Sequence, residues 1–344
     1  MAKKELKLAT FNLFNLQLPN KPMYRGKKYS QAQYNRKVEW SATILKELQA
    51  DIIGFEELWD PKCLDDIFSK AGMKSQYELI STDANPNGIS VALAIRSPHD
   101  AVYTRWIKNF PEQLVLKKRK GTANEPDYQV SVSIDRFSRA VLRVTVKPDM
   151  GITKKVPNIV VCVAHLKSKL GMQLDDEERS QSSIRAHSQA IGSALSTIRR
   201  TAEAAALRVL INTIMRDTDT PIVVLGDLND SQLSVTISII SGEPKYRLFS
   251  KSRTGIKNDR GLYAAATLQE YRSLRDVFYT HIHDGRRESL DHILVSEQFY
   301  DYSKNRIWSF REMRILNDHL DDQDPATSDH AAVCATFDYN PAKK

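Results

Sequence analysis

Residues 222–230 of this 344-residue chain have the sequence IVVLGDLND. Four apolar residues, three of them β-branched, run directly into a glycine, two aspartates and an asparagine. A short apolar run bounded by turn formers predicts a buried strand, and the end of such a strand is where a rigid scaffold presents functional side chains. Gly-Asp-x-Asn is also an ordinary turn sequence, so the meaning of this stretch depends on the rest of the chain.

The rest of the chain repeats this pattern. Buried strands are predicted at residues 6–11, 51–55, 89–95, 159–164, 222–225, 292–295 and 331–337, and alternating strands at 130–134 and 142–146. The spacing of apolar residues predicts a helix over residues 34–48, and a proline-free stretch rich in Ala, Leu and Ile predicts another over residues 180–215. This mixture predicts an α/β fold in which helices cover sheets.

Polar side chains of a narrow chemical range stand at the ends of these strands. They are Asn12, Glu56, Glu57, His165, Asp227, Asn229, Asp291, Asp329 and His330. Each one alone is most often a turn residue, a helix cap or a histidine satisfied by its neighbours. The whole set in one chain, each member at a strand end, is not explained in that way.

The set supplies what metal-assisted hydrolysis of a phosphate ester requires. A hard cation such as Mg²⁺ prefers oxygen ligands. Such ligands are offered by Asn12, Glu57, Asp227, Asn229 and Asp329. The histidines can transfer protons, and Lys167 and Lys169, which follow His165, can hold phosphate oxygens.

The charge of the chain favours a polyanionic partner. Lys and Arg number 50 against 42 Asp and Glu, which gives a net charge of +8 and a pI near 9.2. Such an excess attracts nucleic acid, although a basic protein without such a partner is an equally good interpretation of net charge alone. Basic residues concentrate in three stretches that we predict to be projecting loops, near residues 19–37, 117–127 and 243–262.

The first basic stretch mixes cations with tyrosines. Its cations include Arg25, Lys27 and Lys28, and Tyr24, Tyr29 and Tyr34 stand between them. Such a mixture can follow a phosphate backbone while its rings stack on bases. The alternative is a solvated loop or a helix start whose tyrosines pack inward.

The chain carries no evident targeting segment. No apolar run approaches the roughly 20 residues that span a bilayer, and the charged N-terminus lacks the apolar region of a secretory signal. The three cysteines, Cys63, Cys162 and Cys334, form no CxxC pair. We expect reduced thiols, a cytoplasmic protein and no stable membrane association, although a signal removed beforehand would leave the same sequence. The sequence makes no prediction of oligomeric state.

Several segments resemble, in order and kind, the endonuclease/exonuclease/phosphatase superfamily, which contains deoxyribonuclease I. They are ATFNLFNL, DIIGFEEL, NGISVALAIRS, RFSRAVLRV, VAHLKSK, VLGDLND, LDHILVS and SDHAAV, between residues 6 and 333. The resemblance implies one domain over residues 1–344 with a core at about 6–338, of the bacterial nuclease type. It also implies a four-layer α/β sandwich, in which two packed mixed β-sheets are flanked by helices.

The resemblance further implies a role for each site residue. Asn12 and Glu57 resemble the main metal pair, with Glu56 standing where the family usually has Gln, and Asp329 joins a metal site. Asp227 and Asn229 resemble the residues that orient the water and the phosphate.

For the remaining residues, the resemblance implies proton transfer and phosphate contact. His330 resembles the general base or phosphate-polarising histidine, oriented by Asp291, and His165 the histidine that assists the leaving oxygen. Arg139 resembles an arginine that contacts backbone phosphate. We expect His99, His187, His281 and His283 to lie outside the reaction, and His292 is left open because it adjoins Asp291.

Comparison among the branches of the superfamily favours a nuclease. VAHLKSK and EELW differ from the abasic-site repair enzymes, and LDHILVS lacks the Trp-Cys-Asp-Arg of the 5-phosphatases. We therefore predict a Mg²⁺-dependent phosphodiesterase, with Mn²⁺ able to substitute, that cleaves nucleic acid internally and DNA in preference to RNA. The alternatives are hydrolysis of a lipid or small-molecule phosphate ester and a catalytically silent nucleic-acid-binding module. The acidic stretch 318–324 is either solvated or binds a further cation.

Overall fold

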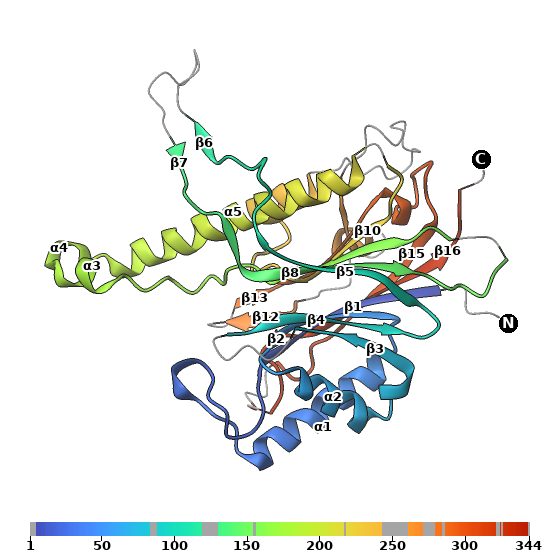
Figure 1. Ribbon diagram of the computed structural model, residues 1–344, viewed down its shortest axis with the longest axis horizontal. Helices are drawn as coiled ribbons and strands as arrows, with labels where there is room; N and C mark the ends of the chain where they lie inside the picture. Colours follow the sequence, from blue (N-terminus) through green and yellow to red (C-terminus); the bar gives the residue numbers. More distant parts are fainter. Residues whose placement is uncertain are drawn as a thin grey trace.

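Two six-stranded mixed β-sheets pack face to face in the structure, which is a computed structural model, and helices cover their outer faces (Figure 1). The structure describes residues 5–82, 88–118, 130–153, 156–216, 218–242, 261–270, 279–283, 286–320, 324 and 326–342. The four-layer sandwich predicted from the sequence is confirmed.

The first sheet has the strand order β15-β16-β1-β2-β4-β3. Its strands are β1 (Glu5–Leu16), β2 (Ile52–Leu58), β3 (Tyr77–Ile80), β4 (Ser90–Arg96), β15 (Trp308–Leu316) and β16 (Ala332–Tyr339). The second sheet has the order β11-β14-β10-β9-β8-β5. Its strands are β5 (Asp100–Asn109), β8 (Arg136–Lys147), β9 (Ile159–Val163), β10 (Ile222–Asp227), β11 (Tyr263–Ala264) and β14 (Asp291–Val295).

Two short strand pairs and a set of helices complete the described part of the chain. The pairs are β6 (Lys117–Lys118) with β7 (Val130–Ser131), and β12 (His281–His283) with β13 (Arg286–Glu288). The α-helices are α1 (Gln31–Leu48), α2 (Pro61–Ala71), α3 (Asp176–Ser180), α4 (Ser182–Arg185), α5 (Ser188–Met215), α6 (Val235–Ser241) and α7 (Ala265–Glu270). The 3-10 helices are η1 (Tyr24–Gly26), η2 (Lys74–Gln76) and η3 (Glu297–Phe299). None of the described helices is long and apolar enough to cross a membrane.

Strands that are apolar on both faces hold the layers together. Side chains on one face of each strand, such as Leu8 and Leu225, form the core between the sheets. On the outer face of the first sheet, Phe11 packs in a core with residues of α1 and α2. On the outer face of the second, Val224 packs in a core with Leu207 of α5. Burial on both faces explains why these strands are continuous apolar runs rather than alternating ones.

The topology brings the polar strand ends to one place. β1 runs parallel to β2, and β9 parallel to β10, so the carboxyl ends of each pair lie at the same edge. β16 is antiparallel to β1, and β14 is antiparallel to β10, so their amino ends meet those carboxyl ends. The pairing of β1 with β16 also places the first and last described strands side by side in one sheet.

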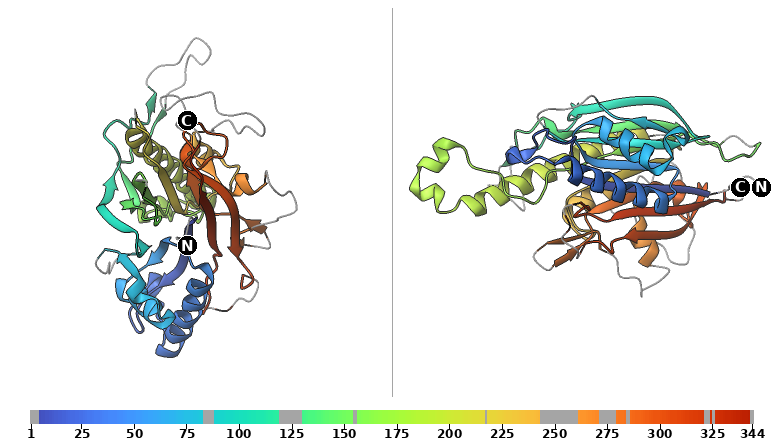
Figure 2. Two further views of the ribbon diagram at one scale, coloured as in Figure 1. Left: turned by 90° about the vertical axis from the view of Figure 1, so that its right-hand side faces the viewer. Right: turned by 90° about the horizontal axis from the view of Figure 1, so that it is seen from below.

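An arm extends from this end of the sandwich. Residues 168–192, which include α3, α4 and the start of α5, project beyond the sheets, opposite the two termini (Figure 2). The Met172 amide donates to the Gly192 carbonyl over 3.0 Å. A Cβ at Gly192 would lie 2.3 Å from the Met172 carbonyl oxygen, so only glycine lets the chain cross the helix there.

Three predicted elements differ in the structure. The helix expected over residues 180–215 is divided into α3, α4 and α5, because Gln181 between the first two has extended backbone. The strand expected over residues 130–134 is limited to β7. The loop expected over residues 19–37 ends at Ser30, which forms a capping box with Gln33 at the start of α1. Most of the other two basic loops, residues 119–129 and 243–260, lies outside the described residues.

Candidate active site

Asp227 lies at the centre of the converging strand ends. Four side-chain nitrogens approach its Oδ2 atom: Asn12 Nδ2 at 3.1 Å, Asn229 Nδ2 at 3.1 Å, His165 Nε2 at 3.3 Å and His330 Nε2 at 3.7 Å. Burial raises the pKa of Asp227, but the charge of His330 and the hydrogen bond from His165 outweigh it and lower the pKa. The carboxylate is therefore ionised, and it joins both sheets of the sandwich.

Local backbone geometry explains how β10 delivers this aspartate. Gly226 has φ +143°, and a Cβ there would lie 1.9 Å from the Ala164 carbonyl oxygen. Glycine thus lets the ends of β9 and β10 approach closely enough for His165 and Asp227 to meet. Asn229 has φ +55°, a left-handed conformation that asparagine tolerates. The backbone N–H of Asn229 donates to Asp227 Oδ1 over 2.9 Å.

The two adjacent glutamates at the end of β2 have different surroundings. Glu57 has φ +62°, its Oε2 accepts from the Asn15 amide at 2.8 Å, and its Oε1 lies 3.9 Å from His165 Nε2. Glu56 is fully buried, accepts from the Thr10 hydroxyl at 2.8 Å, and has a pKa raised well above its usual value by burial. Glu57 is therefore the carboxylate that can meet a ligand.

Asn12 lies behind Asp227, fully buried. Its Nδ2 donates to Asp227 and its Oδ1 accepts from the Phe14 amide at 2.9 Å. An amide oxygen has two lone pairs, so one remains for a cation. The register between β1 and β2 shifts after Asn12, which turns the following residues away from the regular strand.

His330 is fixed by a buried carboxylate. Its Nδ1 lies 2.8 Å from Asp291 Oδ2, which leaves Nε2 facing Asp227. Burial lowers the pKa of His330, but Asp291 and Asp227 outweigh it and raise the pKa well above its usual value. The ring therefore carries a positive charge at neutral pH. Thr280 holds Asp291 in turn, because its hydroxyl accepts from the Asp291 amide at 3.2 Å.

Asp329 is a half-buried carboxylate of this site with a raised pKa. Burial first, and then the charges of Glu57 and Asp227, raise its pKa to about 6. Its Oδ1 is buried without a hydrogen-bond partner among the described residues. Acidic and histidine side chains form three groups here whose ligand atoms lie within 4.8 Å of one another: Glu57 with His165 and Asp227, Asp227 with Asp291 and His330, and His281 with Asp329 and His330. Such clusters fit a divalent cation.

A cleft of about 860 Å³ opens over these residues. Glu57, His165, Asp227, Asn229, Asp329 and His330 line its inner part. The arm forms its outer wall, where Lys169, Leu170, Met172, Arg179 and Arg185 line the cleft. The cleft therefore includes residues of the arm as well as those at the strand ends.

The lysines and the arginine predicted to bind phosphate divide into two groups. Lys169 lines the cleft, with its Nζ 2.8 Å from Glu288 Oε1. Arg139 instead donates to the Leu166 carbonyl at 2.8 Å, and Lys167 Nζ donates to the Leu170 carbonyl at 3.0 Å. Both bind the chain that follows His165, and neither lines the cleft.

The cations of the first basic loop lie outside the cleft. Arg25, Lys27 and Lys28 are exposed, and their loop lies toward the same end of the molecule as the arm (Figures 1 and 2). Lys37 is not a surface cation: it is buried, and its Nζ donates to the Thr327 carbonyl at 2.9 Å. Burial lowers its pKa to about 8.

The tyrosines of this stretch also divide. Tyr34 is buried, and the Tyr29 hydroxyl donates to the Phe14 carbonyl, so both follow the inward-packing alternative. Tyr24 is exposed and packs edge-on against Trp59, with 4.9 Å between ring centroids.

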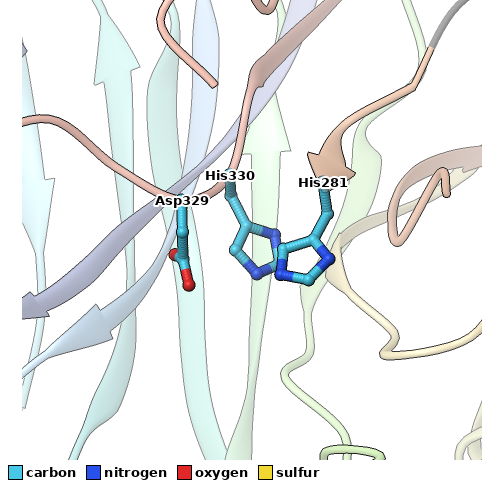
Figure 3. Close-up of side chains that lie close together, drawn as sticks. All are labelled: His281, Asp329 and His330. Atoms are coloured by element: carbon cyan, nitrogen blue, oxygen red, sulfur yellow. The ribbon is translucent and has the colours of Figure 1, made fainter. Parts of the chain in front are cut away.

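His281 lies inside the site, although the sequence predicts it outside the reaction. Its ring centroid lies 4.9 Å from that of His330, and a β-bridge joins the two backbones (Figure 3). His283 also lines the cleft. The HIH segment that forms β12 has no apolar pattern, so nothing in its sequence indicates this position. His292 is structural: it is buried, and its Nε2 lies 2.8 Å from the Asp230 carbonyl oxygen.

The acidic stretch 318–324 lies partly outside the described residues, at 321–323. In the described part, Asp324 Oδ2 forms an ion pair with Arg36 at 2.6 Å. One of the four aspartates of the stretch therefore pairs with a cation of α1 at the surface.

Several solved structures share this fold. The D. rerio TDP2 structure complexed with single-strand DNA product has a TM-score of 0.55 at 13% identity, covering 98% of this chain and 100% of that one. The catalytic domain of human nocturnin with bound sulfate has 0.55 at 13%, covering 98% and 96%. The Bacteroides thetaiotaomicron mannosyl-6-phosphatase Bt3783 has 0.54 at 14%, covering 97% and 100%.

The sequence comparisons agree with the fold. No curated protein matches the chain. The model of the Endonuclease/Exonuclease/phosphatase family matches residues 9–330, a span that contains Asn12, Glu57, Asp227 and His330. The chain therefore belongs to the endonuclease/exonuclease/phosphatase family, whose members are hydrolases of phosphate esters.

Proposed function

We propose that the protein is a Mg²⁺-dependent phosphodiesterase that cleaves the nucleic acid backbone internally, DNA in preference to RNA. The observation that carries the proposal is the cleft, which continues from Asp227 along an arm bearing Lys169, Arg179 and Arg185. A polynucleotide presents a charge every few ångströms, so cations beyond the reactive phosphate contribute only when the substrate is a polymer. The exposed cations of the first basic loop, at the same end of the molecule, extend this surface (Figure 2).

The proposed metal ligands are Asn12, Glu57 and Asp329. A bound Mg²⁺ there would polarise a phosphoryl oxygen and lower the pKa of a water molecule, and Mn²⁺ would substitute for it. The unpartnered Oδ1 of Asp329 and its raised pKa both support a cation at this position, because a positive charge would satisfy both.

The proposed catalytic residues surround Asp227. Asp227 and Asn229 orient the attacking water, since Asp227 is ionised and accepts from donors on both sheets. His330, charged and held by Asp291, polarises the phosphate rather than acting as a base, as the raised pKa of its ring favours. His165 Nε2 passes a proton to the leaving oxygen.

A phosphate ester of a small molecule or a lipid is the second candidate. The mannosyl-6-phosphatase shares the fold about as closely as the DNA-bound TDP2. Leu170 is 71% exposed beside the cleft, and Met172 lies near it. Their apolar surfaces suit the face of a base and also an acyl chain. The family membership and the complete residue set count against the silent-module alternative.

We also propose a cytoplasmic location. Cys63, Cys162 and Cys334 are free and buried, as expected of thiols in a reducing compartment.

A substrate panel tests the proposal. We expect a single-stranded DNA oligonucleotide to be hydrolysed with a higher kcat/KM than bis-p-nitrophenyl phosphate in Mg²⁺, and p-nitrophenyl phosphate and sphingomyelin vesicles to be poor substrates. Replacing Arg179 and Arg185 together by Ala should lower kcat/KM for the oligonucleotide and leave bis-p-nitrophenyl phosphate unaffected. Faster hydrolysis of the monoester or of sphingomyelin than of any polymer would establish the second candidate instead.

A further inference from the structure

Three ligand atoms of residues that line the cleft are buried without a hydrogen-bond partner among the described residues. They are Nδ1 of His165, Nδ1 of His281 and Oδ1 of Asp329. A buried polar atom without a partner is costly, and such atoms in a native protein often mark a ligand or ion. His281 and Asp329 belong to one group of three side chains, which His330 completes, whereas His165 belongs to the group of Glu57 and Asp227.

This group is held together by the backbone. His281 and His330 are joined by a β-bridge, and the Ala331 amide donates to the Thr280 carbonyl at 2.7 Å. The potential ligand atoms of His281, Asp329 and His330 all lie within 4.8 Å of one another. Figure 3 shows the two rings and the carboxylate side by side, extending in the same direction from the backbone. The arrangement therefore needs little rearrangement to bind an ion.

The ring of His330 is oriented for coordination. Its Nδ1 is engaged by Asp291 at 2.8 Å, so Nε2 is the nitrogen left for a metal. A carboxylate that accepts from the distal nitrogen of a histidine is the usual support of a metal-bound imidazole. Asp291 thus supplies the outer contact that such a site requires.

From these contacts we propose a second cation site, formed by His281, Asp329 and His330, that takes a transition-metal ion of the Zn²⁺ class. Two imidazoles and one carboxylate favour such an ion over Mg²⁺, which prefers oxygen. Three protein ligands with one open position are the arrangement of catalytic zinc sites. The site shares Asp329 with the proposed Mg²⁺ ligands and differs from them in its other two members, because Glu57 and Asn12 do not belong to this group.

Binding at this site requires a neutral His330, so the metal would replace the proton on Nε2 and release it to solvent. Both the protonated ring of His330 and a metal ion bound to that ring would place a positive charge beside Asp227. The inference therefore shares Asp329 and His330 with the proposed function, but it concerns a second ion that the proposed hydrolysis does not require.

The test measures metal binding rather than turnover. The protein is stripped with a chelator and titrated with Zn²⁺ by equilibrium dialysis in excess Mg²⁺. We expect the wild type to retain one Zn²⁺, and His281→Ala to lose affinity by at least about tenfold, since even outer contacts of a metal site contribute 10–100-fold. His283→Ala is the matched control: it lies on the same strand and also lines the cleft, but it is outside the group, and its affinity should equal that of the wild type.

Two further measurements keep the outcome clear. Glu57→Gln should retain Zn²⁺, and His281→Gln with a native circular dichroism spectrum guards against misfolding of the alanine variant. A wild type that holds no Zn²⁺ in excess Mg²⁺, or a folded His281 variant that holds it as tightly as the wild type, overturns the inference. Zn²⁺ retention without nucleic acid hydrolysis would leave this site standing and remove the proposed function, and hydrolysis without retention would do the reverse.

Discussion

Nδ1 of His330 and Oδ2 of Asp291 lie 2.8 Å apart at the base of the cleft, both buried. The pair fixes the ring so that Nε2 faces Asp227 at 3.7 Å. The resemblance to the family implies this orienting role from the sequence, and the geometry connects it to the positive charge on the ring.

Replacing the carboxylate should therefore impair turnover. Asp291→Asn removes the charge that raises the pKa of His330 and should lower kcat by about 10²–10³-fold with little change in KM, the range expected when one group that stabilises developing negative charge is lost. His330→Ala should do the same. His187→Ala, at an exposed position, is the control for steady-state kinetics. A loss below tenfold in Asp291→Asn would remove the pair from the mechanism.

The adjacent glutamates should respond differently to the same change. Glu57→Gln should abolish hydrolysis, because it removes a proposed ligand of the cation. EDTA should abolish hydrolysis by the wild type, because it removes the cation itself. Addition of Mg²⁺ or Mn²⁺ should then restore the activity of the EDTA-treated protein. Glu56→Gln should retain activity within about threefold, because Glu56 is buried with a raised pKa and an amide keeps the contact to Thr10. The reverse pattern in a Mg²⁺-dependent assay would assign the metal to Glu56.

Alanine variants of Arg139 and Lys169 should distinguish a residue that positions the chain after His165 from one that contacts the substrate. Arg139→Ala frees the chain after His165 and should lower kcat on DNA and on bis-p-nitrophenyl phosphate alike. Lys169→Ala should mainly raise KM for DNA, because Lys169 lines the cleft. If Arg139→Ala instead raised KM for DNA alone, Arg139 would contact phosphate, as the family resemblance implies.

The metal-free protein should show a pH-dependent stability from Asp329. Its pKa is about 6 in the folded protein against 3.8 as the usual value. Since the folded pKa is the higher one, the contribution of protonated Asp329 is complete below about pH 4 and is lost as pH rises through about 6.

Urea denaturation in EDTA measures this effect. The free energy of unfolding of the wild type, minus that of Asp329→Asn, should fall between about pH 4 and pH 7, and saturating Mg²⁺ should counteract the fall. A difference that is independent of pH would mean that Asp329 has an ordinary pKa in the folded state.

The sheets and most of the inner site are predictable from the sequence, for a physical reason. Strands buried on both faces are continuous apolar runs, and their ends carry the polar groups, so Asp227 and His165 are recognisable without a structure. The resemblance of DIIGFEE to the family pattern points to Glu57, and the left-handed backbone of Glu57 is what separates it from Glu56.

The outer site depends on tertiary contacts that no periodicity reports. His281 comes from a three-residue polar strand, and its place beside His330 follows from a single bridge. The sequence places Lys37 in a basic surface loop. Its buried hydrogen bond to the Thr327 carbonyl joins residues 290 positions apart, and no local pattern indicates such a contact. The arm requires glycine at position 192 within α5. From the sequence alone, a glycine inside a helix is read only as a destabilising residue.

Whether the substrate is a polynucleotide is tested most directly by the salt dependence of DNA binding, measured in Mg²⁺ together with cleavage. The wild type should cleave DNA internally, and its binding constant should fall steeply with salt. Replacing Arg25, Lys27 and Lys28 together by Ala should reduce the log–log slope by roughly 0.7–0.9 for each phosphate that the loop no longer neutralises. Turnover of bis-p-nitrophenyl phosphate should be unchanged in this variant. DNA that stays intact, or a wild-type slope near zero, would contradict a polynucleotide substrate.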